Sequence, residues 1–243
     1  MAGLVLLLSA TRAAPTFAAG PDAAPAPDDA AVSARLAYVE LALLREEAPT
    51  RTWRDGWLGT FSGLSLLQVA LGTATTDNAV RGTAIVGGAK SLLAAASILV
   101  VPYTPLTASS TLRGLGARTP SERRAKLQLA ESLLQRSAVE ERFRRSWIPL
   151  VAGALLNLGG ATVMWAGYRS GGAGWFGLGS GLVVGQLYYQ SQPTGAISAW
   201  AAYARVRDQG AAPPSTASLA ARTPGIRWSI APSAGGVVVQ GTF

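Results

Sequence analysis

The sequence predicts an all-α membrane protein made of two tandem helical hairpins, which gives four transmembrane helices, together with amphipathic flanking helices and a small C-terminal β-hairpin. Three observations predict this fold class. Four apolar stretches of near-bilayer length alternate with stretches in which the charges gather. Charged residues form 14% of the 243 residues, whereas typical soluble domains have roughly 25%. The order of features in the first half of the chain also recurs in the second half.

The first predicted repeat covers residues 29–102. We expect an amphipathic helix over 29–48, and we expect Pro49 to end it because proline cannot donate the next helical hydrogen bond. Two apolar spans follow at 57–74 and 82–101. Each is near the roughly 20 residues that a helix needs to cross a bilayer. A short polar tip joins them, so the pair forms a helical hairpin.

The second predicted repeat covers residues 103–193 and begins with a polar stretch. Thr119 and Glu122 have the spacing of a capping box, which predicts the start of a second amphipathic helix. This helix would lie on the bilayer surface or pack on the bundle. Two further apolar spans, at 147–168 and 175–189, form the second hairpin.

The N-terminal end resembles a secretory signal peptide at residues 1–19, with cleavage near Ala18 or Ala19. The alternative is an apolar tail or a misplaced start codon. Residues 20–28 are rich in proline and alanine, which predicts a linker.

The C-terminal end begins with a short helix predicted at 194–209. A linker and a β-hairpin are predicted over 210–243, with the turn at about 232–236.

A shift of 90 residues aligns the two halves without gaps over about sixty positions. Arg54 and Trp57 then meet Arg144 and Trp147. The alignment predicts a duplication. Because each unit has two spans, both units would share one orientation, related by an axis near the membrane normal.

A face of small residues recurs every four positions in the second and fourth spans. This spacing lets helix backbones approach closely. Three interpretations remain open: a packing seam inside the four-helix bundle, an oligomer interface, or a glycine-lined pore. The residues of this face are Gly87, Ser91, Ala95, Gly177, Gly181 and Gly185.

Lys90 is the charged residue in the middle of a predicted span. An ionisable side chain at that depth is a candidate functional group. No acidic residue lies at a matching depth in another span, which favours snorkelling to the interface or a structural contact. Gln68, Asn157 and Gln186 are the other polar candidates, and such side chains usually join helices by hydrogen bonds.

The sequence contains no recognisable catalytic, cofactor or metal motif. It has no His and no Cys, which excludes disulfides, thiolate nucleophiles and Cys/His zinc sites. The glycine-rich tip at 169–174 lacks the surroundings of a nucleotide loop. We therefore predict no enzyme and no cofactor. The favoured function is a non-enzymatic membrane scaffold or assembly component, and the alternative is a small transporter or pore that uses the bundle interior.

The net charge of +8 comes almost entirely from arginines that flank the apolar stretches. This placement favours a lipid bilayer as the partner over nucleic acid. A homo-oligomer is possible through the small-residue face, and the sequence identifies no protein partner.

The layout resembles small bacterial membrane proteins with four helices and no assigned activity, so the resemblance implies no functional residue. The last residues before Phe243 also resemble the C-terminal signal of outer-membrane β-barrel proteins, but residues 91–101 do not alternate as barrel strands do. We expect a membrane of the bacterial cell envelope, the inner membrane rather than the outer.

The charge distribution and the N-terminal end predict opposite topologies. Eighteen of the 21 basic residues lie in the N-terminal end, the 102–146 loop and the C-terminal tail, which the positive-inside rule places in the cytoplasm. A cleaved signal peptide would place all three outside. The proline-rich segment after residue 19 favours export.

Overall fold

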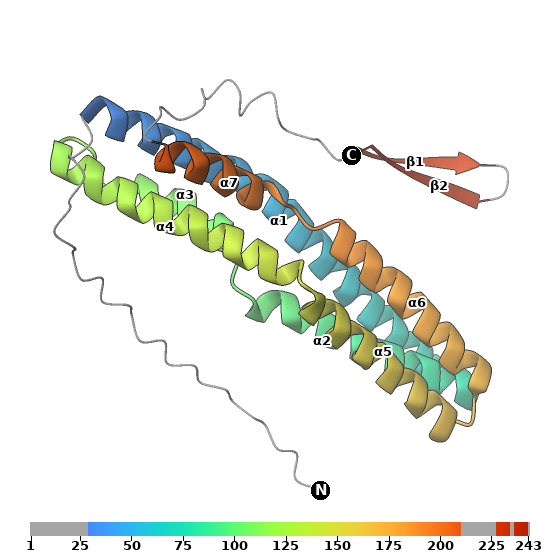
Figure 1. The fold of residues 1–243 in the computed structure, drawn as a ribbon. Coiled ribbons are helices and arrows are strands. Elements are labelled where there is room, and N and C mark those ends of the chain that lie inside the picture. The colour runs from blue at the N-terminus through green and yellow to red at the C-terminus, as the bar shows by residue number, and fades with distance from the viewer. Residues whose placement is uncertain (1–28, 210–226, 234–235, 243) are drawn as a thin grey trace, which may run out of the picture.

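The longest element is α1 (Asp29–Ala74), a helix of 46 residues that runs the length of the helical assembly (Figure 1). The computed structural model describes residues 29–209, 227–233 and 236–242. The predicted signal peptide and both predicted linkers lie outside these residues. The other elements are α2 (Asn78–Val100), α3 (Pro105–Arg113), α4 (Pro120–Arg144), α5 (Trp147–Ala166), α6 (Gly171–Gln190), α7 (Gly195–Asp208), β1 (Arg227–Ser233) and β2 (Gly236–Thr242).

The prediction that Pro49 ends the first helix is wrong, because α1 continues through it. A proline inside a helix removes one backbone hydrogen bond and costs about 3 kcal/mol. Packing on both sides offsets this cost, since Leu43, Thr50 and Trp53 are all buried. Pro49 itself is exposed, so its ring does not press on a neighbouring helix.

The hairpin tips differ in detail from the prediction. Asp77 caps α2 by accepting a hydrogen bond of 2.9 Å from the Val80 backbone N–H, so the helix begins at Asn78. The predicted tip at 169–174 is only partly correct, because α6 already begins at Gly171. Arg169 makes the turn instead, with a φ of 50°.

The capping box that the sequence predicts at the start of α4 is present. The Glu122 N–H donates to Thr119 Oγ1 at 3.2 Å, and the Thr119 N–H donates to Glu122 Oε2 at 3.0 Å. Backbone hydrogen bonds to the Glu122 carboxylate lower its pKa. The short helix α3 was not predicted, because its sequence is polar and only nine residues long.

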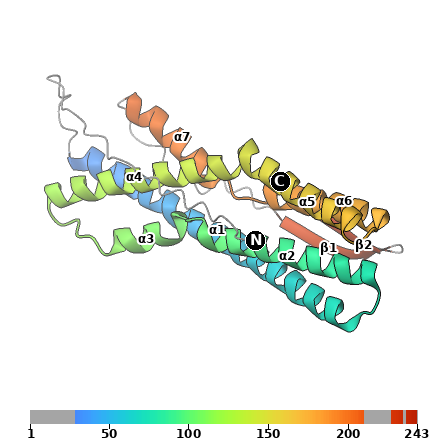
Figure 2. The ribbon, with the colours of Figure 1, turned by 90° about the horizontal axis from the view of Figure 1, so that it is seen from below.

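The helices form two bundles that meet end to end (Figures 1 and 2). The charged bundle contains residues 29–53 of α1 with α3, α4 and α7. The apolar bundle contains residues 57–74 of α1 with α2, α5 and α6. Residues far apart in sequence therefore lie side by side, since α1 packs against α2, α3 and α4, and α2 packs against α5.

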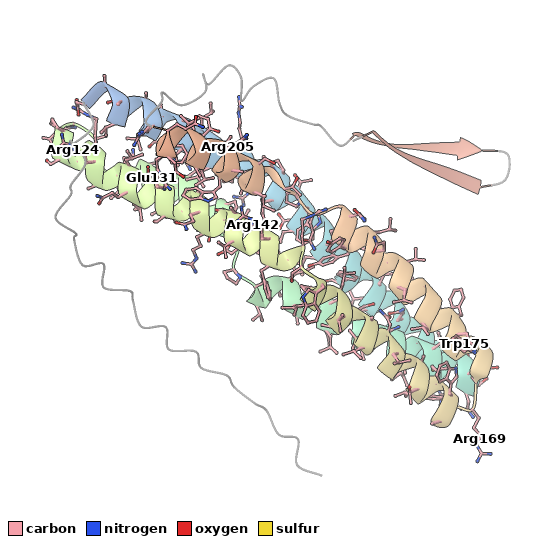
Figure 3. All side chains as sticks on the ribbon, viewed as in Figure 1. Arg124, Glu131, Arg142, Arg169, Trp175 and Arg205 are labelled. Atoms are coloured by element: carbon pink, nitrogen blue, oxygen red, sulfur yellow. The ribbon has the colours of Figure 1, made fainter. Side chains whose placement is uncertain are left out.

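The charged bundle has an apolar core and a polar exterior. Figure 3 labels Arg124, Glu131, Arg142 and Arg205 on its helices. Ion pairs join its helices: Lys126 to Glu40 at 2.7 Å, and Arg123 to Asp29. The buried core consists of Val32, Leu36, Tyr38, Val39, Ala42, Leu43, Ala108, Leu112, Leu127, Ala130, Leu134, Ala199 and Tyr203.

The apolar bundle has the opposite arrangement, because large apolar side chains cover its exterior. Leu66 is 72% exposed, Leu155 62% and Val183 61%. Further exposed residues of the same kind are Leu67, Val69, Ile85, Leu92, Leu93, Leu99, Val100, Trp147, Val151, Val163, Trp175, Phe176 and Leu187.

Two helical stretches, Asn78–Arg113 and Pro120–Ala166, are long and apolar enough to cross a membrane by length and composition. In the second, only 11% of the most apolar window is buried within the protein, unlike the core helix of a soluble domain. The predicted spans in α1 and α6 are less apolar, because glycine, serine and threonine dilute their leucines and valines.

The two strands pair antiparallel, with Arg227 opposite Thr242 and Ser233 opposite Gly236.

Candidate functional site

Lys90 lies in the interior of the apolar bundle, half-buried between helices. Its Nζ donates to Asn157 Oδ1 at 2.9 Å and to the Gly177 carbonyl oxygen at 3.2 Å. One side chain of α2 thus joins α5 and α6. The sequence leaves snorkelling and a structural contact open for Lys90. These two hydrogen bonds agree with the structural contact.

In each hairpin of the apolar bundle, an amide side chain packs against a glycine of the neighbouring helix. Gln68 of α1 lies over Gly87 of α2 and accepts a hydrogen bond of 3.2 Å from Ser91 Oγ. Asn157 of α5 lies over Gly181 of α6, where a Cβ atom would collide with it. A larger residue at either glycine would displace the amide.

The six residues of the small-residue face do not share one environment. Ser91 and Ala95 are buried, and Gly87 and Gly181 each face an amide within the same chain. By contrast, a Cβ atom built on Gly177 or Gly185 would meet nothing within 4 Å. Part of the face is therefore an internal seam, and part of it is open.

Gln186, the last polar candidate, is exposed on the outer side of α6. It therefore belongs neither to the Lys90–Asn157 contact nor to the Gln68–Ser91 contact in the interior.

A second cluster of polar side chains, which the sequence analysis missed, lies where the two bundles meet. We call it the junction layer. It consists of Glu46, Thr50, Trp53, Tyr103, Glu141, Arg144, Tyr188, Ser191 and Gln192.

Two glutamates of the junction layer lie at the start of α7. Glu141 is 1% exposed, and its Oε2 accepts a hydrogen bond of 3.0 Å from the Ile197 N–H. Glu46 of α1 lies against Gly195, where a Cβ atom would collide with its carboxylate. Burial and the neighbouring Glu141 raise the pKa of Glu46 from 4.5 to about 7. Burial also raises the pKa of Glu141 to about 7, against the opposing effect of Arg144.

Adjacent glutamates of α4 cap two different helices. Glu141 caps α7 by accepting the hydrogen bond from the Ile197 N–H. Glu140 caps α3 by accepting hydrogen bonds from the Thr104 N–H at 2.9 Å and from Thr104 Oγ1 at 2.6 Å. A carboxylate at a helix N-terminus satisfies free N–H groups and complements the helix dipole. These contacts orient α3 and α7 on the two sides of α4.

Arg144 and the aromatic residues fill the rest of the junction layer. The Arg144 guanidinium lies 4.8 Å from the centre of the Tyr103 ring. The Tyr188 ring packs 4.9 Å from Trp53. Ser191 Oγ accepts hydrogen bonds from Trp53 Nε1 at 3.1 Å and from a second indole, that of Trp57, at 2.9 Å.

Several polar atoms of this layer are buried and have no hydrogen-bond partner within the part of the chain that the structure describes. They are Thr50 Oγ1, Glu141 Oε1, both terminal nitrogens of Arg144, and Gln192 Oε1. The junction layer thus combines buried polar atoms without a partner with two carboxyl groups, Glu46 and Glu141, whose pKa burial raises. Among the described residues, no group of three or more Asp or Glu side chains is arranged to hold a metal ion.

No protein-family model, curated protein or solved structure matches this chain.

Proposed function

We propose that this chain is an integral membrane protein in which the four helical stretches of the apolar bundle cross the bilayer, while the charged bundle lies in water at one face. We propose that it acts as a non-enzymatic scaffold or assembly component. The observation that carries the proposal is the inverted polarity of the apolar bundle, with leucine and valine outside and Lys90, Asn157 and Gln68 inside.

The exposed leucines and valines of the apolar bundle favour lipid over water as its surroundings. Monomeric soluble proteins rarely expose apolar patches beyond a few hundred Å². In a bilayer, the same surface meets acyl chains at no cost. Polar side chains and glycines then hold helices together, because lipid supplies no hydrophobic force between them. The contacts of Lys90 and the amide-on-glycine pairs follow this pattern.

Lengths and aromatic positions support the same placement. Helices α5 and α6 have 20 residues each, or about 30 Å, which matches the hydrocarbon core. Exposed aromatic rings stand near both ends, with Trp147 at the junction and Trp175 at the far tip, beside Arg169 (Figure 3). Such rings favour the head-group region.

The element bounds support a duplication, which we include in the proposal. Helix α2 ends at residue 100 and α6 at residue 190, and α3 begins at 105 and α7 at 195. Each pair differs by the 90 residues of the sequence offset. In this proposal α1 corresponds to α4 and α5 together. The C-terminal β-hairpin follows the second unit and lies outside the repeat.

The scaffold role rests on the open part of the small-residue face. Gly185→Leu adds a large side chain where the protomer leaves space, so it should break an oligomer and leave the fold intact. The matched control is Leu182→Ala, an exposed position on the same helix that we expect to be tolerated. A blue-native gel in mild detergent should show a smaller species for Gly185→Leu only. An unchanged oligomer would count against the scaffold role.

The transporter alternative rests on the inward position of Lys90. Lys90→Met keeps the length of the side chain and removes its charge. Flux through liposomes that contain the purified protein should be unchanged if the protein is a scaffold. A changed flux with an intact oligomer would favour the alternative.

We further propose a membrane of the bacterial cell envelope, the inner rather than the outer. A reporter fused after Phe243, active on one side of the inner membrane, reads the side of the C-terminal tail. An external reporter signal would agree with a cleaved signal peptide. A cytoplasmic one would agree with the positive-inside rule and contradict export.

A further inference from the structure

A pocket of about 190 Å³ lies at the corner where α1, the end of α2 and the start of α3 meet. It is at the level of the junction layer, where the apolar bundle gives way to the charged one. Arg54 and Thr107 supply the polar part of its wall. The apolar part comes from Ile98, Leu99, Val101 and Leu106, with Tyr103 between the two.

Positive charge gathers around this pocket. Arg54 gives its Nε and one terminal nitrogen to Asp55, at 2.9 and 2.7 Å, and an arginine has five N–H donors in all. Arg144 stacks on the ring of Tyr103 and is 6% exposed, and neither of its terminal nitrogens has a hydrogen-bond partner among the described residues. Burial raises the pKa of Tyr103, and both arginines oppose that shift, so both act on its hydroxyl.

The apolar wall continues onto the exterior of the apolar bundle. Leu99 lines the pocket and is 68% exposed, and the next residue, Val100, is 81% exposed. A ligand that suits this corner has an anionic group for Arg54, which lines the pocket, and an apolar chain that follows α2 into the hydrocarbon region.

The corresponding corner of the second unit is filled by its own side chains. Tyr188 and Tyr189 stand at the positions of Ile98 and Leu99, 90 residues later. Tyr188 packs into the aromatic cluster, and the Tyr189 hydroxyl donates to the Arg145 carbonyl oxygen at 2.8 Å. The first unit thus keeps open a corner that aromatic side chains close in the second.

We infer that this pocket binds the head-group phosphate of an anionic phospholipid, with Arg54 as the direct contact and an acyl chain lying along Leu99 and Val100. The inference rests on the proposed membrane insertion. An arginine fork matches phosphate geometry, and charge-assisted hydrogen bonds are stronger than neutral ones.

The test compares Arg54→Gln with Arg51→Gln in the full chain. Arg51 lies one turn earlier on α1, outside this pocket, and pairs with Glu47 on the surface. Each variant is placed in nanodiscs of phosphatidylcholine alone or of phosphatidylcholine and phosphatidylglycerol in equal amounts. Thermal unfolding and native mass spectrometry report on lipid binding.

We expect phosphatidylglycerol to raise the Tm of the wild type and of Arg51→Gln. Arg54→Gln should lose most of that gain and retain the lipid about tenfold more weakly, as for one lost charge-assisted contact. Equal losses in the two variants would overturn the inference, since they would report general surface charge. A full Tm gain from soluble glycerophosphoglycerol would also overturn it, since the site would then bind a free anion.

A second measurement does not depend on variants. Phosphatidylglycerol with a photoactivatable group near its head should crosslink to residues 98–107 of the wild type, and crosslinks elsewhere would contradict the site. Failure of the proposed function gives a different result, because the protein would then not enter nanodiscs at all.

Discussion

The two bundles are built from the same kind of element but place their leucines differently. In the charged bundle Val39, Leu43 and Leu134 are fully buried. In the apolar bundle Leu66 is 72% exposed and Leu99 68%. Local helix formation is the same in both, and under the proposed membrane placement the difference follows from what surrounds each bundle. In the charged bundle, burial of leucine drives packing. If the apolar bundle lies in lipid as proposed, hydrogen bonds and close backbone approach replace that force.

Helix α1 belongs to both bundles, so the change of environment occurs within one continuous helix. The change falls between Thr50, which is fully buried, and the run of exposed leucines from Leu64 to Leu71. Tryptophans 53 and 57 stand in this interval and share Ser191 as their hydrogen-bond acceptor. Both indole N–H groups thus have an acceptor at the level where, in the proposed membrane placement, water gives way to lipid.

The largest expected effect comes from a leucine truncation in the charged bundle. Leu134→Ala creates a cavity in a packed core and should lower the free energy of unfolding by about 2–5 kcal/mol. Leu66→Ala removes the same atoms from an exposed position and should cost far less. Urea unfolding followed by circular dichroism measures both. Equal costs would contradict the difference between the bundles.

A charge placed on the exterior gives the next effect. Val183→Arg puts a cation on the outside of the apolar bundle, where insertion into a bilayer should be less favourable by about 2.5–3.5 kcal/mol. Val139→Arg makes the same change at a residue of similar exposure in the charged bundle and should be neutral. Carbonate extraction of cell membranes reads the inserted fraction. Two neutral variants would place both surfaces in water.

The smallest effect concerns pH and the junction layer. The pKa of Glu141 is raised from 4.5 to about 7 in the folded protein, so the folded state holds its proton more tightly than the unfolded chain. The contribution of Glu141 to the free energy of unfolding is therefore fully present below about pH 4.5. It is lost as the pH rises through about 7. Glu46 adds a fall in the same window.

Glu141→Gln keeps an oxygen for the Ile197 N–H and removes the charge. It should flatten the fall in stability and raise the Tm above pH 7. The exposed carboxylate variant Asp208→Asn serves as the control and should retain the wild-type profile. A profile for Glu141→Gln that matches the wild type would show that this carboxylate does not govern the pH dependence.

Features that depend on local sequence were predictable. The capping box of Thr119 and Glu122 is present, because it needs only residues three positions apart. The short helix predicted at 194–209 is present as α7 (Gly195–Asp208). The apolar stretches were also correctly placed on helices.

Features that depend on contacts between distant residues were not predictable. Pro49 reads locally as a helix end, yet the packing of Thr50 and Trp53 carries α1 through it. Glu46 and Glu141 are 95 positions apart and meet only because α1 and α4 pack side by side at the start of α7. No spacing rule connects such residues.

The sequence by itself determined most of the helical segments, their order and the division into apolar and charged stretches, because hydropathy and capping act over a few residues. Only the tertiary structure decided that Lys90 turns inward to Asn157. It also decided that Gly181 packs inside the bundle while the space beside Gly185 is empty. The polar layer that joins the bundles depends on the tertiary structure as well. The physical reason is that burial and hydrogen bonding between helices depend on which faces meet, and the packing of the whole chain decides those faces.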